Sequence, residues 1–309
     1  MSYAQGSLID AADYNGLIGS NSTTAGTINY VWDVGNGAFG YGQGAISVVS
    51  AAGTVTATQW STMLNALNRS LQHQSGAGAS LGPVNYTAGS TIIYFANVNT
   101  SVTTINTNAA LYTAQGTTTT GSNFDDAVST AAALTAQAYG TRTVTFASAN
   151  AARYFFNAGG QLNYVVSTPT AAGVGRNADF VGLIGGLGGW GQRNTTATGR
   201  TGTGQTVNTN STTFGYRNNA VNTWTSVVAI TSTASTYTSD TADIQVQTNS
   251  ADTTNGANGL TVQFRCLYTI ADKPFDDTIT VTHRVRVDIV YPETTYLNGA
   301  APWGTPVVS

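Results

Sequence analysis

A period-two alternation near the end of the chain constrains the fold more than any other feature. Apolar residues and one histidine take every second position there: Ile279, Val281, His283, Val285, Val287, Ile289 and Tyr291. Residues 262–270 follow the same pattern. Successive side chains of a strand point to opposite faces, so this period predicts two strands, each with one buried face. The linker 272–277 favours their antiparallel pairing within a two-sheet sandwich.

Composition supports a mainly β fold. Charged residues make up only 8% of the chain, and Lys273 and Glu293 are the single lysine and glutamate. Because Lys and Glu normally cover the wet faces of helices, their scarcity argues against a helical globule. Abundant Thr fits half-exposed strands and abundant Gly fits turns. We therefore expect a surface that is polar but uncharged, which gives a free monomer little protection against association.

The same numbers exclude several classes of function. A net charge of −3 excludes coating of nucleic acid through phosphate neutralisation, and binding of acidic substrates through a broad basic patch. Cys266 is the only cysteine, so neither an intrachain disulfide nor a cysteine-based metal cluster is expected. The first residues lack a secretory signal, and no apolar run is long enough to span a membrane. We expect a protein made in a cytoplasm and not exported by that route.

Residues 1–80 are predicted to form a small helical N-terminal docking module. A capping-box-like start at Ser7–Asp10 predicts a helix over about 8–18. Thr56–Gln59 is a better start of the same capping-box kind for a second helix, whose apolar face at helical spacing comprises Trp60, Met63, Leu64, Leu67 and Leu71. Between the helices, the glycine-rich residues 35–44 predict a loop anchored by two aromatic residues, Phe39 and Tyr41.

Residues 81–140 are predicted to be a mixed strand and helix connecting region. The run Thr91–Phe95 is typical of a strand. A helix is expected over about 123–138, because Ser122–Asp125 can cap it and Asp125 and Asp126 would then occupy its first turn.

Residues 141–309 are predicted to form an antiparallel β-sandwich domain. Short strands are expected at 143–146, 152–156 and 162–167, with Asn157–Gly160 as a hairpin turn. The apolar, glycine-rich residues 180–190 suggest a short helix with a loop, and the polar residues 191–212 suggest an exposed loop or a segment that is locally disordered when alone.

Paired carboxylates are the first candidates for chemistry. Asp125–Asp126 and Asp276–Asp277 are the adjacent pairs. A glycosidase needs two carboxyl groups that face each other across a bond, whereas neighbouring residues on a helix point about 100° apart. We interpret Asp125 and Asp126 as charges that stabilise the start of a helix.

Histidine and cysteine offer little more. His283 lies on the apolar face of a strand and is interpreted as a buried, hydrogen-bonded histidine. His73 is expected to complement the dipole at a helix end, before the stop at Gly76. Cys266 is interpreted as a small inert core residue, and a cross-strand Cys266–His283 pair as the less favoured alternative.

Glycine-rich and Asn-rich runs do not match known ligand sites. Residues 182–188 and 35–44 lack the lysine and the spacing of a phosphate-binding loop. Residues 249–256 lack the ligand spacing of an EF-hand and are explained as turns. We therefore predict no catalytic, cofactor-binding or metal-binding residues, no cofactor, and no enzymatic activity.

Two blocks of sequence carry a family resemblance. The first comprises Asp13-Tyr-Asn, Gly35–Gln43, Val55–Trp60, Leu67-Asn-Arg and His73–Gly76; the second is Arg153-Tyr-Phe-Phe-Asn-Ala-Gly-Gly160, followed by a Gly-rich stretch and a β-rich end. Together they resemble the virion structural proteins of large contractile-tailed cyanophages and related tailed phages. The motifs are structural, so no catalytic residues carry over. After Gly160 the chain lacks the charged residues expected of the family, which leaves its position in the particle open.

The resemblance implies a structural component of a tailed-phage virion. Among the positions left open, we favour a tail, neck or fibre-associated one, with assembly as a symmetric oligomer. Its partners would be copies of itself and other virion proteins, with neither nucleic acid nor a membrane span involved. A capsid decoration protein is one alternative. Another is a carbohydrate-binding β-sandwich that binds host surface glycans through exposed Trp190, Trp224 or Trp303. A third, a polysaccharide depolymerase, would need carboxylates that converge in a cleft.

Overall fold

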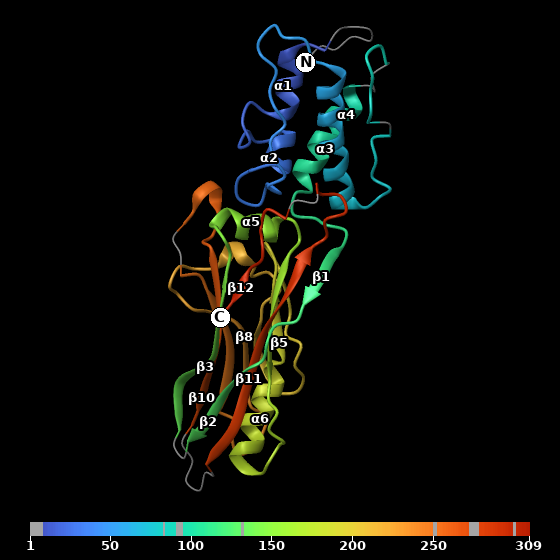
Figure 1. Cartoon of the computed structure of the whole chain (residues 1–309). Coiled ribbons are helices and arrows are strands. Elements are labelled where there is room, and N and C mark those ends of the chain that lie inside the picture. The colour runs from blue at the N-terminus through green and yellow to red at the C-terminus, as the bar shows by residue number, and fades with distance from the viewer. Residues whose placement is uncertain are drawn as a thin grey trace.

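The structure is a computed structural model that describes residues 9–82, 84–90, 95–130, 133–249, 252–271, 278–298 and 301–309. It has N-terminal helices at one end and two antiparallel sheets, packed against each other as in a β-sandwich, at the other (Figure 1). We call the helices α1–α4 with their connecting loops the helical head. The predicted mainly β fold with helices at the N-terminus is confirmed.

The helical head is built around its longest helix. Its helices are α1 (Ala11–Ile18), α2 (Ile28–Trp32), α3 (Ala57–Ser75) and α4 (Phe95–Thr107). Helix α3 begins with the predicted capping box, in which Thr56 and Gln59 bond each other's backbone N–H groups. All five apolar residues predicted for its inner face are buried. They pack the head's core together with residues of α1, α2 and α4.

Two predictions in this part of the chain need correction. Helix α1 begins later than expected, because Asp10 is its N-cap and its Oδ1 accepts a hydrogen bond from the Asp13 N–H at 2.7 Å. Ser7 lies outside the described residues. The predicted strand 91–95 also lies outside them, except for Phe95, which begins α4 instead. Helix α4 packs against α2 and α3, so it belongs spatially to the head.

The first sheet, sheet A, is centred on the long C-terminal strand. Its order is β1-β11-β4-β5-β6, and β2 pairs with the same central strand β11. The strands are β1 (Gln115–Thr119), β2 (Phe124–Thr130), β4 (Gln161–Ser167), β5 (Gly189–Gln192), β6 (Ala197–Thr198) and β11 (Ile279–Pro292).

The second sheet, sheet B, has the order β12-β3-β10-β9-β8-β7. Its strands are β3 (Leu134–Thr145), β7 (Thr206–Asn210), β8 (Thr225–Thr231), β9 (Thr241–Gln247), β10 (Thr261–Ile270) and β12 (Val307–Val308). Short 3-10 turns lie at Tyr216–Asn218 and Thr254–Gly256.

The two strands predicted from alternation exist, but they do not pair with each other. Strand β10 lies between β3 and β9, whereas β11 lies in the other sheet. They face each other across the sandwich core, where the rings of Tyr268 and His283 have centroids 5.5 Å apart. Alternation identifies a buried face without identifying the neighbouring strand, so the antiparallel pairing we expected is wrong. Their linker 272–277 lies outside the described residues.

The predicted helix 123–138 is wrong, because the chain forms β2 and the start of β3 there. Strand β2 pairs residue by residue with β11, and Asp125 stands opposite Arg284. Neighbouring strand residues point to opposite faces, so the two aspartates separate. Asp125 bonds Arg284, while Asp126 Oδ2 accepts from the Gly140 N–H at 2.6 Å. Tertiary pairing overrides the local capping signal.

The predicted strand 152–156 is also wrong, since these residues belong to helix α5 (Ala149–Asn157). The N-cap Ser148 accepts a hydrogen bond from the Ala151 N–H at 3.0 Å, a signal that the sequence carried and our interpretation missed. The turn at 157–160 is therefore a helix exit into β4 and not a hairpin. The strands predicted at 143–146 and 162–167 are confirmed, within β3 and β4.

Residues 180–190 were only partly predicted. The helix there, α6 (Gly175–Leu187), is longer than expected and packs against strands of both sheets. Residues 191–212, expected to be a loop, instead contain the end of β5 and the short strands β6 and β7. Thr and Asn in this stretch therefore serve as edge-strand residues.

Candidate functional site

The best-organised polar site among the described residues is a joint between the helical head and the sandwich. We define the joint as the glycine loop (residues 35–44), helix α5, and the described C-terminal residues 293–298 and 301–306. Helix α5 lies at the end of the sandwich that faces the head (Figure 1). The loop and α5 were both singled out in the sequence, and the structure brings them together.

Two side chains of α5 bind the backbone of the glycine loop and of the residue before it. Arg153 and Asn157 are four residues apart, so they lie on the same face of the helix. The Arg153 guanidinium donates to the carbonyl oxygens of Phe39 and Val34. The Asn157 side-chain amide donates to the carbonyls of Gly37, Phe39 and Gly40 at 3.2, 2.9 and 3.1 Å.

Glycine is required in the loop because of these close approaches. Gly40 has φ 99°, and a Cβ there would lie 2.1 Å from the Val34 carbonyl oxygen. Gly35 has φ 58°, and its Cβ would lie 2.4 Å from the Tyr30 carbonyl oxygen. The loop can therefore present several carbonyls to α5 only when these positions carry no side chain.

Aromatic residues fix the other side of the loop, as predicted. Tyr41 is fully buried, and its hydroxyl accepts a hydrogen bond from Gln74 of α3 at 3.0 Å. Phe39 packs on Tyr30 with ring centroids 4.5 Å apart. The loop is thus held by the head through its aromatic residues and by α5 through its carbonyls.

The C-terminal segment adds a third connection. Leu297 and Trp303 are buried in it, at 2% exposure each. The Leu297 carbonyl accepts from Arg69 of α3 at 3.1 Å, and the Asn298 N–H donates to Gln43 Oε1 at 2.8 Å. Beyond this segment the chain joins sheet B as β12, so one stretch of chain contacts both the head and the sandwich.

The electrostatics of the joint suit a structural role. Arg153 is fully buried, and burial lowers its pKa from the usual value of an arginine. The hydrogen bonds that satisfy it go to carbonyl oxygens and to Asn150 Oδ1. A buried guanidinium held by neutral acceptors offers no proton transfer near neutral pH, but it fixes the positions of its acceptors firmly.

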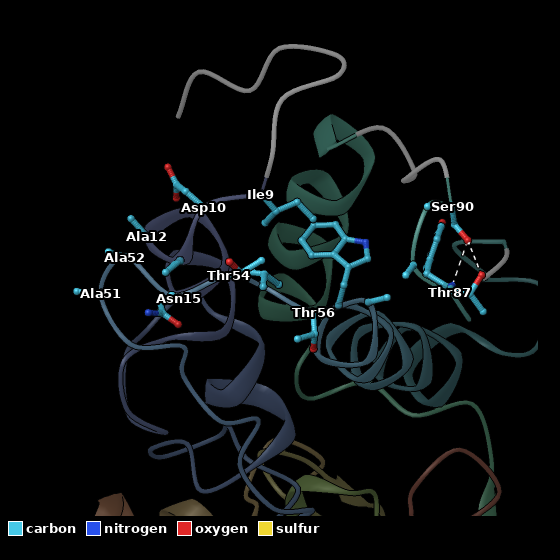
Figure 2. Close-up of a pocket in the computed structure, with 18 residues that line it drawn as sticks. Ile9, Asp10, Ala12, Asn15, Ala51, Ala52, Thr54, Thr56, Thr87 and Ser90 are labelled. Carbon is cyan, nitrogen blue, oxygen red and sulfur yellow. Dashed lines mark hydrogen bonds between the residues drawn. The ribbon is translucent and has the colours of Figure 1, made fainter.

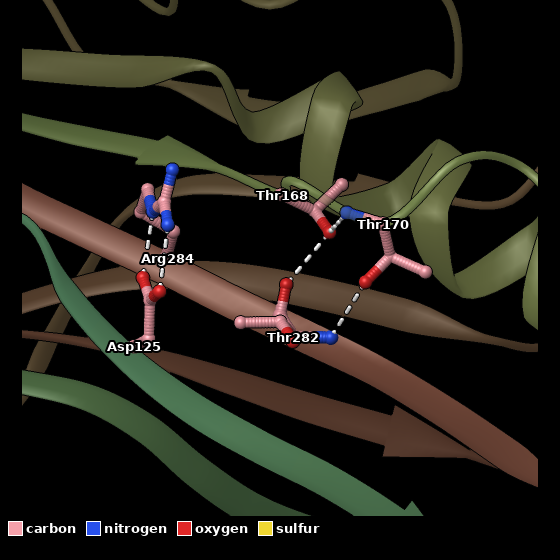
Figure 3. A network of polar contacts seen from close by, with 5 residues as sticks. All are labelled: Asp125, Thr168, Thr170, Thr282 and Arg284. Carbon is pink, nitrogen blue, oxygen red and sulfur yellow. Dashed lines mark hydrogen bonds and ion pairs between the residues drawn. The ribbon is translucent and has the colours of Figure 1, made fainter.

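The carboxylates considered for catalysis are dispersed. Figure 3 shows Asp125 on β2 reaching Arg284 on β11, with both carboxylate oxygens bonded at 2.6 and 2.7 Å. Arg284 holds the pKa of Asp125 below its usual value through this hydrogen bond. Asp276 and Asp277 lie outside the described residues.

Beside this ion pair, two threonine side chains bond the backbone of β11. Thr168 donates to the Thr282 carbonyl at 2.6 Å, and Thr170 Oγ1 accepts from the Thr282 N–H at 2.9 Å (Figure 3). They continue the hydrogen bonding of β11 beyond the end of β4. Uncharged polar residues thus satisfy the backbone where pairing between strands stops.

His73 lies in the last turn of α3, and Gly76 ends the helix as predicted. Its predicted role as a cation at the helix end is not supported. The side chain is 2% exposed, and burial lowers its pKa to about 4, so the imidazole is neutral at pH 7. Its ring instead packs edge-on against Tyr41 at 5.0 Å within the joint.

His283 and Cys266 are both buried in the sandwich core. Burial lowers the pKa of His283 to about 4 and raises that of Cys266 to about 12, so both are neutral at pH 7. The Cys266 sulfur contacts the Tyr164 hydroxyl at 3.5 Å. Neither nitrogen of His283 has a hydrogen-bond partner among the described residues, contrary to the expected bonded histidine. A thiol of this kind is not an activated nucleophile.

The tryptophans offer little surface for sugars. Trp190 and Trp303 are 1% and 2% exposed, so they serve the core. Trp224 is half-buried, and its ring lies under the Arg265 guanidinium, 4.2 Å from the ring centroid. In the described part of the chain, no group of three or more metal-ligating side chains gathers.

A hollow of about 1130 Å³ opens in the head, at the end away from the sandwich. Figure 2 shows Asp10, Asn15, Ala51 and Ala52 on one side of it and Thr87 and Ser90 on the other. Many of its lining residues are Ala or Gly, so their short side chains leave it unfilled. Sequence reasoning gave no sign of this hollow, because its walls come from three separate segments.

A buried carboxylate site was also missed. Asp179 on α6 and Asp240 beside β9 are 5% and 0% exposed. Asp179 accepts a hydrogen bond from Ser232, yet burial, assisted by Asp240, raises its pKa to about 6. The two aspartates are 61 positions apart in sequence, and only the packing of α6 on the sheets brings them together.

Comparison with known proteins does not assign this chain to a family. No family model, no curated protein and no solved structure matches this chain. Of the helices that the structure describes, none is both long enough and apolar enough to cross a membrane.

Proposed function

We propose that this chain is a structural component of a tailed-phage virion, tail, neck or fibre-associated, that acts by subunit–subunit assembly. One observation carries the proposal: the two sequence blocks that resemble virion proteins meet in the joint. Arg153 and Asn157 come from one block and the glycine loop comes from the other.

The chemistry of the joint supports a mechanical role. Its buried polar groups are used to fix backbone atoms, and His73, which packs against Tyr41 of the joint, is neutral at pH 7. A joint of this kind sets the angle between the head and the sandwich. Proteins that assemble into particles need such a fixed angle, because neighbouring subunits must meet in register.

The composition supports the same proposal. With 8% charged residues, the chain has few side chains that would oppose contact with a neighbour. The carbohydrate-binding alternative draws on Trp224 alone, since the other two candidate indoles are buried. Tail, neck or fibre association therefore remains the leading proposal. Capsid decoration is the alternative in which the chain keeps a structural role but lies on the capsid.

The test is to examine purified particles of the phage that encodes the chain. We expect mass spectrometry to find the chain in particles purified through a density gradient, in a stoichiometry that fits a symmetric ring or fibre. A side-chain-resolution map of those particles should show the head and the sandwich at the angle set by the joint. Absence of the chain from particles that are infectious and complete would refute the proposal.

A further inference from the structure

Strand β1 leaves one edge of sheet A open. It pairs with β11 on one side, and it is the last strand of the sheet on the other. Figure 1 shows it on the outer flank of the sandwich, just below the helical head. Within the described ranges, no backbone hydrogen bond covers its outer side. Its free N–H and C=O groups can therefore accept another strand.

Apart from an irregularity in its pairing with β11 between Gln115 and Thr118, this edge carries little of the usual protection against pairing. Natural edge strands are normally guarded by lysine, proline or inward-pointing charges. From Gln115 to Phe124 the chain contains neither a charged residue nor a proline, and Thr117–Thr120 are exposed. Leu111 before the strand is 52% exposed, and Phe124 after it is 39% exposed. The edge is polar along its length and apolar at both ends.

The strand is also held firmly in place. A Cβ on Gly116 would lie 2.7 Å from the Pro292 carbonyl oxygen, and one on Gly121 would lie 2.2 Å from that of Val287. The Gly121 N–H donates to Asp288 Oδ1 at 3.0 Å, and Arg286 bonds the same carboxylate. A partner strand would therefore meet a preformed edge and would not have to order it.

Another edge strand, β7 in sheet B, is less suitable. Both edges have an irregular pairing, β7 with β8 between Val207 and Thr209 and β1 with β11 between Gln115 and Thr118, so the difference lies in charge. Arg200 lies beside it, with its N–H bonded to Asn210 Oδ1 at 2.7 Å. Like β1 it exposes threonine, at Thr206, which makes it a matched control.

We propose that β1 pairs antiparallel with β1 of a second copy of this chain about a two-fold axis, which joins the two copies of sheet A. The inference rests on the proposed function, because it names the surface through which subunits assemble. A strand that pairs with its own copy about a two-fold axis faces its own sequence in reverse. The run 115–124 then sets threonines against threonines and brings no like charges together.

We call this contact between the two β1 strands the β1 seam. Cysteine cross-linking tests it directly on the full chain. Thr117→Cys, Thr118→Cys and Thr119→Cys place single thiols along β1, and Thr206→Cys places one on β7. The native Cys266 is fully buried, so it does not compete. Under mild oxidation we expect at least one β1 variant to form a disulfide-linked dimer on a non-reducing gel, while the β7 control stays monomeric. Cross-linking of the β7 variant alone, or of none, overturns the inference.

Reversible association gives a second measurement. Thr118→Lys sets like charges across the axis, and we expect it to weaken self-association about tenfold or more in sedimentation velocity. Thr206→Lys should leave association unchanged. If the wild type associates and only Thr206→Lys weakens it, the seam lies elsewhere and the proposed function stands. If the wild type stays monomeric at high concentration, the β1 seam is refuted, and the presence or absence of the chain in particles still decides the function separately.

Discussion

The helical head and the sandwich satisfy their backbones in different ways. In the sandwich, long strands bond one another along β10 and β11. In the helical head, asparagine side chains bond backbone groups that a neighbouring strand would otherwise bond. Asn15 bonds both the N–H and the C=O of Val49, and Asn29 does the same for Ile46. Amide side chains donate and accept at once, so they can replace a strand neighbour.

The difference teaches how a chain with few charges is held together. Both regions use neutral polar groups where many proteins use ion pairs. The sandwich depends on the register between strands, and the head depends on a few individual side chains. We therefore expect the head to be more sensitive than the sandwich to single substitutions at polar positions.

The largest expected effect comes from breaking the joint. Arg153→Met keeps an unbranched side chain but removes the guanidinium that donates to the Val34 carbonyl and one of the two side chains that donate to the Phe39 carbonyl. We expect a loss of about 2–4 kcal/mol in unfolding free energy. Calorimetry should then resolve two transitions, with the head melting before the sandwich. Arg284→Met, at an exposed ion pair, is the control and should leave a single transition. A single, unshifted transition in Arg153→Met would show that α5 does not couple the two regions.

The next effect concerns the sandwich alone and depends on pH. Asp179 has a pKa of about 6 in the folded protein, above its unfolded value of 3.8, so it disfavours folding as pH rises between these values. Asp179→Asn removes this cost and can still accept from Ser232. We expect a gain of about 2–3 kcal/mol at pH 7.5, shrinking to none near pH 4, in urea titrations. A gain that does not change with pH would contradict the assignment.

The smallest expected effect is the difference in stability between variants of the two buried histidines. Both have pKa values lowered to about 4, so stability is full above pH 6.5 and is lost as pH falls towards 4. His283→Phe should cost little at pH 7, because neither ring nitrogen has a partner among the described residues. His73→Phe should cost about 1 kcal/mol at pH 7, because it loses a hydrogen bond with the Ala158 backbone.

Each histidine variant should also reduce the loss of stability that its own region shows as pH falls from 6.5 towards 4. Thermal scans at pH 7 and pH 4.5 check both parts of this comparison. Equal costs for the two variants at pH 7 would show that the head and the sandwich hold their histidines alike.

Several elements followed from local pattern. The capping box and the apolar spacing of α3 predicted that helix, and the alternation of residues 279–291 predicted β11. The failures came where distant partners decide. The run 123–138 has a plausible helix start. It forms strands instead, because β2 pairs with the edge of β11 and Asp125 stands opposite Arg284. The aromatic run 152–156 looked like a strand, because the cap at Ser148 was overlooked.

The sequence by itself determined that charged side chains are few and which faces of β10 and β11 are buried, because these depend on residue type and local period. Only the tertiary structure decided which strands are neighbours, and it alone joined Arg153 to Val34, 119 residues away. A periodic pattern specifies a face to be covered but contains no information on what covers it. That choice depends on contacts between residues far apart in the chain, and the joint, the buried aspartates and the open β1 edge all result from it.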